Sequence, residues 1–202
     1  CDANSDSPAG SDSGNACLCH VGYTGTLSGA TALSGSCSIC PASTFKGVAG
    51  TASCVACGAH SDSPAGSNGG DDCLCTVGYT GTLSGTTSLS GSCSICAAGT
   101  YKADSGTASC GNCPSGKFKG SQGQDAESDC VPCDVNSHSP AGSDSGDNCL
   151  CNMGYTGTLS GATALSGSCS ICPASTFKGA AGTTACVACD ASSDSLAGSE
   201  SG

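Results

Sequence analysis

The sequence predicts a small disulfide-rich fold, mostly irregular with short β-hairpins and almost no helix, arranged as an elongated tandem array. Cysteine content is the first reason: 21 of the 202 residues are Cys, a level typical of secreted scaffolds held by disulfides. Aromatic residues are only 3% of the chain, so apolar burial offers little against the roughly 1–2 kcal/mol of backbone entropy that ordering each residue costs. An internal repeat is the third reason.

The repeat begins with the segment CDANSDSPAGSDSG at Cys1 and returns at Cys57, Cys133 and Cys189. Successive copies are 56, 76 and 56 residues apart, and the longer step contains a 20-residue insert at 111–130, GNCPSGKFKGSQGQDAESDC. We therefore predict repeat units at 1–56, 57–132 and 133–188, with 189–202 as the start of a further, truncated unit. Neither end resembles a capping repeat, so we expect the array to continue in both directions.

Each 56-residue repeat unit divides into three cysteine loops, which lie at 1–17, 19–37 and 40–54 in the first unit, and the insert adds a fourth to the 57–132 unit. The loop at 1–17 is rich in Asp, Ser, Pro and Gly, which favour turns. The loop at 19–37 contains VGYTGTL, and its β-forming residues interrupted by Gly predict a short, twisted hairpin. The loop at 40–54 is again rich in turn residues and has one aromatic. No stretch has the sustained 3.6-residue apolar period of a helix.

The cysteines fit two kinds of site. The spacing CxxC-x13-CxxC at Cys37, Cys40, Cys54 and Cys57 matches a zinc ribbon. However, each 56-residue unit has six Cys rather than four, and the three His occupy non-equivalent repeat positions. A repeated metal site needs its ligands in every copy, so disulfides are favoured and we expect no metal.

One disulfide scheme pairs the two cysteines that bound each loop, although crossed pairs within the CxxC clusters stay open. A closed loop of about 15 residues contributes roughly 3 kcal/mol in the chain-entropy model. Cys189 is left over, and the scheme expects its partner beyond Gly202. The ten predicted pairs are Cys1–Cys17, Cys19–Cys37, Cys40–Cys54, Cys57–Cys73, Cys75–Cys93, Cys96–Cys110, Cys113–Cys130, Cys133–Cys149, Cys151–Cys169 and Cys172–Cys186.

Two motifs resemble known extracellular modules. The runs CPASTFKGVAGTASCVAC, CAAGTYKADSGTASCGNC and CPSGKFKGSQGQDAESDCVPC resemble the cysteine-rich ephrin-receptor-like module. NSDSPAGSDSGNACLCHVGYTG is similar to the EGF-like segment that accompanies it, although the 19–37 loop is longer than the usual final EGF loop. The resemblance implies an extracellular protein of β-turns and short hairpins. Such modules occur in receptor ectodomains and in long surface proteins of protists and algae, some of which build flagellar hairs.

The acidic charge of the chain disfavours two classes of partner, nucleic acids and anionic membranes. The formal net charge is −11, and the basic residues are five Lys with no Arg. A chain with no basic stripe lacks the electrostatic footprint of a nucleic-acid-binding protein, and its acidity disfavours an anionic membrane surface. No apolar run approaches the roughly 18–20 residues of a membrane span. We therefore expect neither nucleic acid as a partner nor a membrane span within this chain.

Catalytic chemistry has little support, and we expect no enzymatic activity. None of the three His recurs in register as a base, and CxxC redox chemistry needs a βαβ context that is missing. No cofactor is expected. Calcium is the alternative, since carboxylates in turns are suitable oxygen donors; yet Asp and Ser also favour turns, and no fixed ligand set repeats. The carboxylates considered are Asp2, Asp6, Asp12, Asp62, Asp71 and Asp72.

Hydroxyl side chains are dense in TGTLSGATALSGS at 24–36 and in its copies from 80 and 156. Extracellular Ser/Thr-rich segments commonly carry O-linked glycans, and we expect them here. The alternative is that these hydroxyls only solubilise a surface with little core beneath it. The candidate sites are Thr24, Thr26, Ser28, Thr31, Ser34, Thr80, Thr82, Thr156 and Thr158.

The aromatic residues recur at fixed positions of the repeat, and this pattern has two interpretations. Each ring covers a neighbouring disulfide as the small core of its own loop, or the rings dock successive loops or adjacent protomers; the two are compatible. The residues are Tyr23, Tyr79 and Tyr155 in the hairpin loop, Phe45, Tyr101 and Phe177 in the next, and Phe118 in the insert.

Together these features predict a structural protein that self-associates as part of an extracellular fibre, surface appendage or stalk. The alternative is a receptor or adhesion ectodomain that binds a protein or glycan ligand. Near-identical copies favour the structural role, because a dedicated ligand site usually distinguishes one copy from the others.

Overall fold

A computed structural model describes residues 1–201 of the chain. Every strand in this range is two residues long, and the helical elements in it are 3₁₀ turns of three residues. The turns are η1 (Gly14–Ala16), η2 (Gly70–Asp72), η3 (Glu127–Asp129) and η4 (Gly146–Asn148). The strands are β1 (Ser5–Asp6), β2 (Leu18–Cys19), β3 (Tyr23–Thr24), β4 (Ser38–Ile39), β5 (Thr44–Phe45), β6 (Val55–Ala56), β7 (Ser61–Asp62), β8 (Leu74–Cys75), β9 (Tyr79–Thr80), β10 (Leu83–Ser84), β11 (Ser90–Gly91), β12 (Ser94–Ile95), β13 (Thr100–Tyr101), β14 (Gly111–Asn112), β15 (Lys117–Phe118), β16 (Val131–Pro132), β17 (Ser137–His138), β18 (Leu150–Cys151), β19 (Tyr155–Thr156), β20 (Ser170–Ile171), β21 (Thr176–Phe177) and β22 (Val187–Ala188).

The strands form two-stranded antiparallel sheets that recur with the repeat. In the first repeat unit β1 pairs with β2, β3 with β4 and β5 with β6. The β1–β2 pair recurs as β7–β8 and β17–β18, and the β3–β4 pair recurs as β19–β20. The β5–β6 pair recurs as β13–β14 and β21–β22, and the insert adds β15–β16. An isolated two-stranded sheet is at best marginally stable in water, so cross-links and contacts between loops must stabilise these hairpins.

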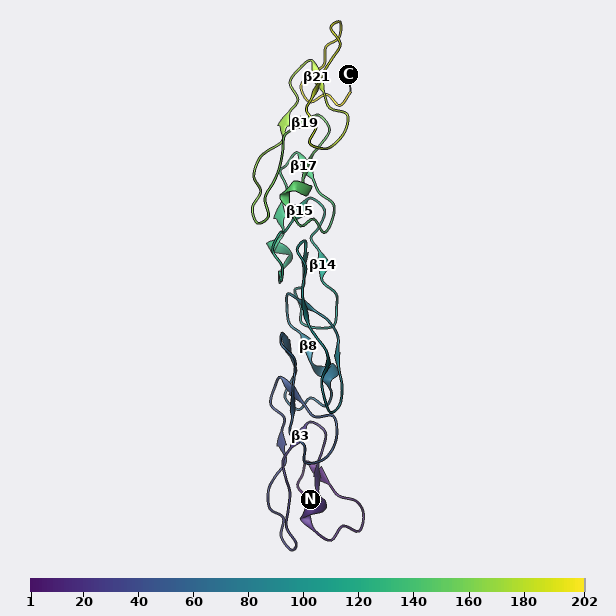
Figure 1. The fold of residues 1–202 in the computed structure, drawn as a ribbon, viewed down its shortest axis with the longest axis vertical. Helices are drawn as coiled ribbons and strands as arrows, with labels where there is room; N and C mark the ends of the chain where they lie inside the picture. The colour runs from purple at the N-terminus through teal and green to yellow at the C-terminus, as the bar shows by residue number, and fades with distance from the viewer. Residues whose placement is uncertain (202) are drawn as a thin grey trace. The chain divides into compact units, whose positions relative to one another are not determined.

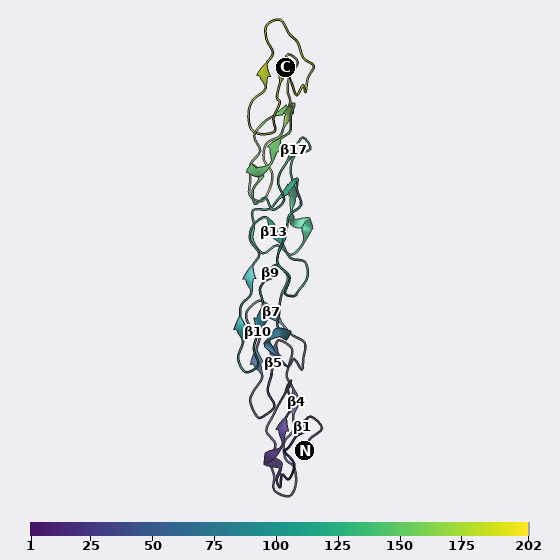
Figure 2. The same cartoon turned by 90° about the vertical axis from the view of Figure 1, so that its right-hand side faces the viewer.

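Contacts between Cα atoms divide the chain into two compact units. The first comprises Cys1–Ser94 with Ser105–Ser109, and the second comprises Ile95–Asp104 with the residues from Cys110 onward. Figure 1 labels β3 and β8 in the first unit and β15 and β19 in the second, each a short arrow between long irregular segments. Figure 2 shows β1, β4, β5, β7 and β10 of the first unit in the same way. The repeat units at 1–56, 57–132 and 133–188 stay a prediction.

Ten disulfides close loops whose two cysteines are 14–18 residues apart, with Cα–Cα distances of 5.4–5.8 Å, within the usual range for disulfides. The structure brings together the two cysteines of each predicted pair. Cys37, Cys40, Cys54 and Cys57 belong to three different disulfides, so the structure holds no thiolate quartet at the zinc-like spacing.

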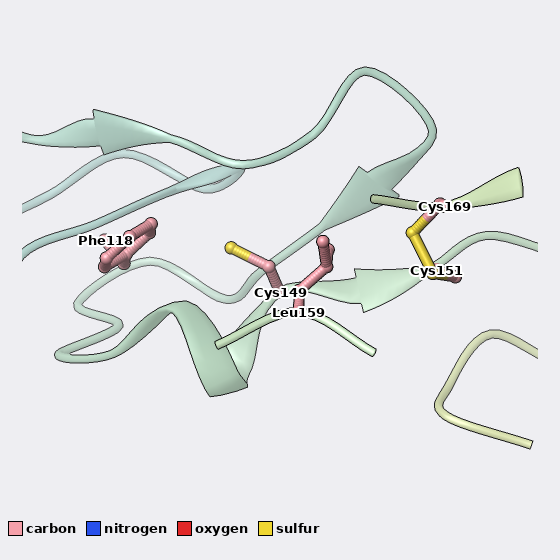
Figure 3. Close-up of a cluster of buried hydrophobic side chains, with 5 residues drawn as sticks. All are labelled: Phe118, Cys149, Cys151, Leu159 and Cys169. Atoms are coloured by element: carbon pink, nitrogen blue, oxygen red, sulfur yellow. A yellow bond between two sulfur atoms is a disulfide. The ribbon is translucent and has the colours of Figure 1, made fainter. Parts of the chain in front are cut away.

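The buried apolar residues form small clusters built largely from cystine sulfur. One cluster of the first compact unit joins Cys17, Cys19, Leu27 and Cys37, with Tyr23 packed against it. A cluster of the second unit contains an aromatic ring as well. Figure 3 shows Phe118 on one side of Cys149 and Leu159, and the Cys151–Cys169 disulfide on the other. The predicted fold class is confirmed: a disulfide-rich chain of serial modules with short antiparallel hairpins.

Candidate functional site: the junction between successive loops

The aromatic residue of β5 is buried by residues of the following repeat unit. Phe45 has no exposed surface and clusters with Cys73 and Leu83, with Val55 and Leu89 packed around them. Its counterpart in the insert, Phe118, is likewise fully buried, against Cys149 and Leu159. These two rings therefore join successive loops, which is the second of the two interpretations considered for the aromatic pattern.

Backbone hydrogen bonds run in both directions across this junction. Lys46 N–H donates to the carbonyl of Ser67 at 3.0 Å, and Gly47 N–H donates to the carbonyl of Thr86 at 3.0 Å. In return, Gly66 N–H donates to the carbonyl of Cys40 at 2.8 Å. The segment Phe45–Lys46–Gly47 is thus held by the burial of its ring and by the two hydrogen bonds that it donates. A third hydrogen bond, from Gly66, reaches Cys40 at the start of the same loop.

The insert makes the same contacts toward the loop that follows it. Lys119 N–H donates to Ser143 O at 3.0 Å, and Gly120 N–H donates to Ala162 O at 2.7 Å. Gly142 N–H donates to Cys113 O at 2.9 Å. We call the segments 45–47 and 118–120 the docking segments, and the surface that receives each of them the receiving surface.

The insert also provides a receiving surface to the loop before it. Lys102 N–H donates to Gln124 O at 3.0 Å, and Gly123 N–H donates to Cys96 O at 2.8 Å. These bonds repeat those of Lys46 and Gly66 with Ser67 and Cys40. The insert therefore carries backbone contacts of both halves of the junction, one toward each neighbouring loop.

Glycine is required where two backbones approach most closely. A Cβ on Gly47 would lie 2.6 Å from the Cα of Thr86, closer than side-chain atoms tolerate. A Cβ on Gly22 would collide with the carbonyl oxygen of Gly66, and Gly154 stands in the same relation to Gly198. Gly22 also has a positive φ of 74°, which is costly for residues with a side chain.

The lysine of the first docking segment is buried. Only 2% of Lys46 is exposed, and its ammonium donates to the carbonyls of Tyr23 at 2.6 Å and Gly50 at 2.5 Å. Tyr23 belongs to the preceding hairpin and Gly50 to the lysine's own loop. The side chain therefore ties together two loops through backbone oxygens, a way of satisfying a buried charged donor without a carboxylate.

Lys178 repeats this arrangement in the second compact unit. It is 3% exposed and donates to the carbonyls of Tyr155 at 2.7 Å and Gly182 at 2.6 Å, with that of Cys151 at 3.4 Å. Burial lowers the pKa of both Lys46 and Lys178 below 10.5, because removal from water disfavours the charged form. Burial also lowers the pKa of Lys102, and the charge of Asp104 offsets part of that effect.

Sequence reasoning missed this role of lysine. It used the five Lys only to exclude a basic surface, although four of them directly follow an aromatic residue. That recurring aromatic–Lys pair was the available signal. A charged residue at a fixed distance from a buried ring in every copy indicates a shared structural position rather than a solvated face.

The predicted glycan sites fall into two groups. Thr24, Thr80 and Thr156 are half-buried, and each hydroxyl donates to the carbonyl of a residue 28 positions later, at 3.1, 3.1 and 3.3 Å. The other candidates are exposed: Thr26, Ser28, Thr31, Ser34, Thr82 and Thr158. Only the second group has hydroxyls available without loss of a described hydrogen bond, and glycosylation there stays a prediction.

Several carboxylates considered for calcium take part in local hydrogen bonds. Asp2 accepts from Cys37 N–H at 2.9 Å, and this bond is the main cause that lowers the pKa of Asp2. Asp6 lies 2.9 Å from His20 Nε2, Asp62 accepts from Ser43 Oγ at 2.8 Å, and Asp72 accepts from Asn68 N–H at 2.9 Å. Among the described residues, no three His, Cys, Asp or Glu are grouped so as to hold a metal ion.

Cys189 is half-buried and is the one cysteine without a disulfide in residues 1–201. Its thiol lies 3.4 Å from the hydroxyl of Ser195, the distance that also separates Cys57 Sγ from Ser63 Oγ. Its surroundings therefore repeat those of a cysteine that is bonded elsewhere in the chain.

Comparison with known families gives a match to part of the chain. Residues 81–130 match the model of the tyrosine-protein kinase ephrin type A/B receptor-like family. These residues include the 96–110 loop and the insert loop, so the resemblance to the ephrin-receptor-like module is confirmed there, while the EGF-like resemblance stays a prediction. No curated protein matches the chain. None of the helical turns in the described range is long and apolar enough to cross a membrane.

Proposed function

We propose that this chain is a non-catalytic, structural repeat segment of an extracellular fibre, surface appendage or stalk. One observation carries the proposal: the same junction is built at 45–47 and at 118–120, from a buried ring and backbone hydrogen bonds. The buried Lys46 and Lys178 join successive loops through backbone carbonyls, and the bonded cysteines close the loops.

An oxidising location supports this role. Ten disulfides in 202 residues persist only where thiols are not kept reduced, which favours the extracellular space. The ephrin-receptor-like match at 81–130 also favours an extracellular location, because the family is described as receptor-like.

The mechanical argument follows from the short loops. Each disulfide bridges cysteines 14–18 residues apart, so pulling on the chain bypasses the residues inside the loop and extends only the short links between loops. An extended chain spans about 3.3–3.6 Å per residue, so every closed loop withholds most of its contour length. A segment built in this way resists stretching without a large apolar core.

A receptor or adhesion ectodomain is the second candidate, and the family match at 81–130 favours it. In that role the loops would hold a ligand-binding domain away from the membrane, or bind a protein or glycan themselves. Near-identical receiving surfaces in successive repeat units argue for the spacer role, because a ligand site usually differs from its neighbours.

Electron microscopy of native material, labelled with an antibody raised against residues 1–202, separates the two candidates. The structural proposal expects label at regular intervals along filaments or stalks. Label confined to dispersed monomers or to diffuse patches of cell membrane would contradict it and favour the ectodomain. A matched control uses antibody absorbed with the recombinant chain.

We also propose O-linked glycans on the exposed hydroxyls, with Thr26, Thr82 and Thr158 as the first sites. They occupy equivalent positions and are exposed, so a glycosyltransferase reaches them without opening a loop. Intact-mass measurement of native protein tests this: a mass equal to that of the polypeptide less its disulfide hydrogens would remove the proposal. Peptide mapping then distinguishes these threonines from the hydrogen-bonded Thr24, Thr80 and Thr156.

A further inference from the structure

The first repeat unit presents a receiving surface on which no docking segment lies. Leu33 is 43% exposed, whereas its counterparts Leu89 and Leu165 pack against the clusters that contain Phe45 and Phe118. Beside Leu33 is a hollow of about 280 Å³, whose lining includes Ser11, Gly14, Cys17 and Ala30. The apolar contacts that a ring supplies in the later units are missing here.

The hydrogen-bonding groups of this surface are also in place. Ser11 and Ala30 correspond to Ser67 and Thr86, whose carbonyls accept from the docking segment at 45–47. Gly10 corresponds to Gly66, whose N–H donates to Cys40 O at 2.8 Å. In the described chain Gly10 N–H has no such acceptor. The surface thus offers two carbonyls, one amide and an apolar wall in the arrangement that is filled elsewhere.

The filled copies show which kind of segment fits. The loops at 40–54 and 113–130 share Phe–Lys–Gly and a Pro four positions before the ring, but differ in length and at most other positions, PASTFKGVAGTAS against PSGKFKGSQGQDAESD. Both nevertheless place a fully buried ring and the same backbone bonds on the next repeat unit. The receiving surface therefore contacts the ring, the backbone groups and the glycine of the docking segment, and it accepts different residues in the rest of the loop.

We propose that the surface formed by Gly10, Ser11, Gly14, Ala30 and Leu33 is a docking site for the Phe–Lys–Gly segment of one further disulfide loop of the insert type. The insert is the best-matched occupant because the surface that it fills has Ala162 where this surface has Ala30, whereas the surface that receives the 40–54 loop has Thr86 there. This inference goes beyond the proposed function, since it holds for a fibre segment and for a receptor stalk alike.

The test adds the occupant to the whole chain. A second copy of residues 111–132 is fused directly before Cys1, which recreates the natural link from Pro132 to Cys133. Amide hydrogen exchange of Gly10 is then followed by NMR in the fused and unfused chains after both have been oxidised. A new backbone hydrogen bond with Gly10 as donor should slow its exchange by about tenfold or more.

Two variants of the fused copy control the result. Gly120→Ala in that copy should abolish the protection of Gly10, because a Cβ on Gly120 in the natural junction would lie 2.8 Å from the Cα of Ala162. Ser115→Ala changes an exposed residue of the same loop and should leave the protection intact. Peptide mapping of all chains verifies that the added loop is closed by its own disulfide.

Two outcomes would overturn the proposal. One is unchanged exchange of Gly10 in a fused chain whose added loop is correctly bonded. The other is protection of Gly10 in the unfused chain that grows with concentration and that the fusion does not increase, because the occupant would then be a second chain. Neither outcome depends on whether native material forms filaments, so this inference and the proposed function can fail separately.

Discussion

The ammonium of Lys46 donates a 2.6 Å hydrogen bond to the backbone carbonyl of Tyr23, a residue of the preceding hairpin. This contact places a charged side chain at the centre of a loop junction in a chain that has only five basic residues. Lys178 makes the equivalent bond to Tyr155. Stability should therefore depend on a residue type that is usually free in solvent.

Replacement of Lys46 by Met should lower the free energy of unfolding by about 1–3 kcal/mol, because it leaves two partly buried carbonyls without this donor while keeping an apolar stem of similar length. Urea unfolding of the oxidised chain measures the change. Lys117→Met is the matched control: Lys117 is about one-third exposed and pairs with Glu127 at 3.1 Å, an interaction worth about 0–1 kcal/mol. Equal losses for the two variants would contradict the buried role of Lys46.

Stability should rise with pH in the alkaline range. Burial lowers the pKa of Lys46, Lys102 and Lys178 below 10.5, so between that lowered pKa and 10.5 the folded chain binds fewer protons than the unfolded chain. The free energy of unfolding then increases as pH rises through this window. Unfolding measured from pH 8 upward should show the rise, and the triple Met variant should show less of it. A Cys189→Ser background removes thiol exchange from both chains.

Gly47→Ala should destabilise the junction by about 1–3 kcal/mol, the usual cost of forcing atoms into a filled space. Its Cβ would lie 2.6 Å from the Cα of Thr86, whereas the nearest atom to a Cβ on Gly111 is 3.8 Å away. Gly111→Ala is therefore the control and should change stability by less than about 1 kcal/mol. Thermal unfolding of both variants compares them, and a Gly47→Ala chain as stable as the wild type would show that the two loops do not touch.

Peptide mapping of the unreduced chain should recover Cys40 joined to Cys54 in a single fragment, as the structure has it. A fragment joining Cys37 to Cys54 would contradict the sequential pattern. Replacing Cys40 and Cys54 together by Ser should cost roughly 3 kcal/mol, because the open 14-residue loop regains its freedom in the unfolded chain.

The fold class could be predicted from the sequence, because disulfides between cysteines close in sequence are a local property of the chain. It also identified Phe45 and Phe118 as recurring positions, but it could not choose between a ring that covers its own loop and one that joins two loops. That choice depends on Leu83 and Leu159, which are tens of residues away and become neighbours only in the fold. The recurring aromatic–Lys pair marks Lys46 as a shared structural position, but its acceptors, the backbone carbonyls of Tyr23 and Gly50, cannot be identified from the sequence.

The insert carries one half of the junction on each side, and this limits which changes in chain length the fold accepts. A recombination event that gains a whole second copy of 111–130 leaves every joint with a complementary neighbour, because the stretch accepts from Lys102 on one side and donates from Lys119 on the other. Loss of the whole stretch would instead bring Ala103, which occupies the position of Gly47 and Gly120, against the next repeat unit. An event that removes half of the stretch strips a cysteine of its partner. Inherited length variation in this protein should therefore come in whole loops, and a chain that has lost the insert should also carry Gly at position 103.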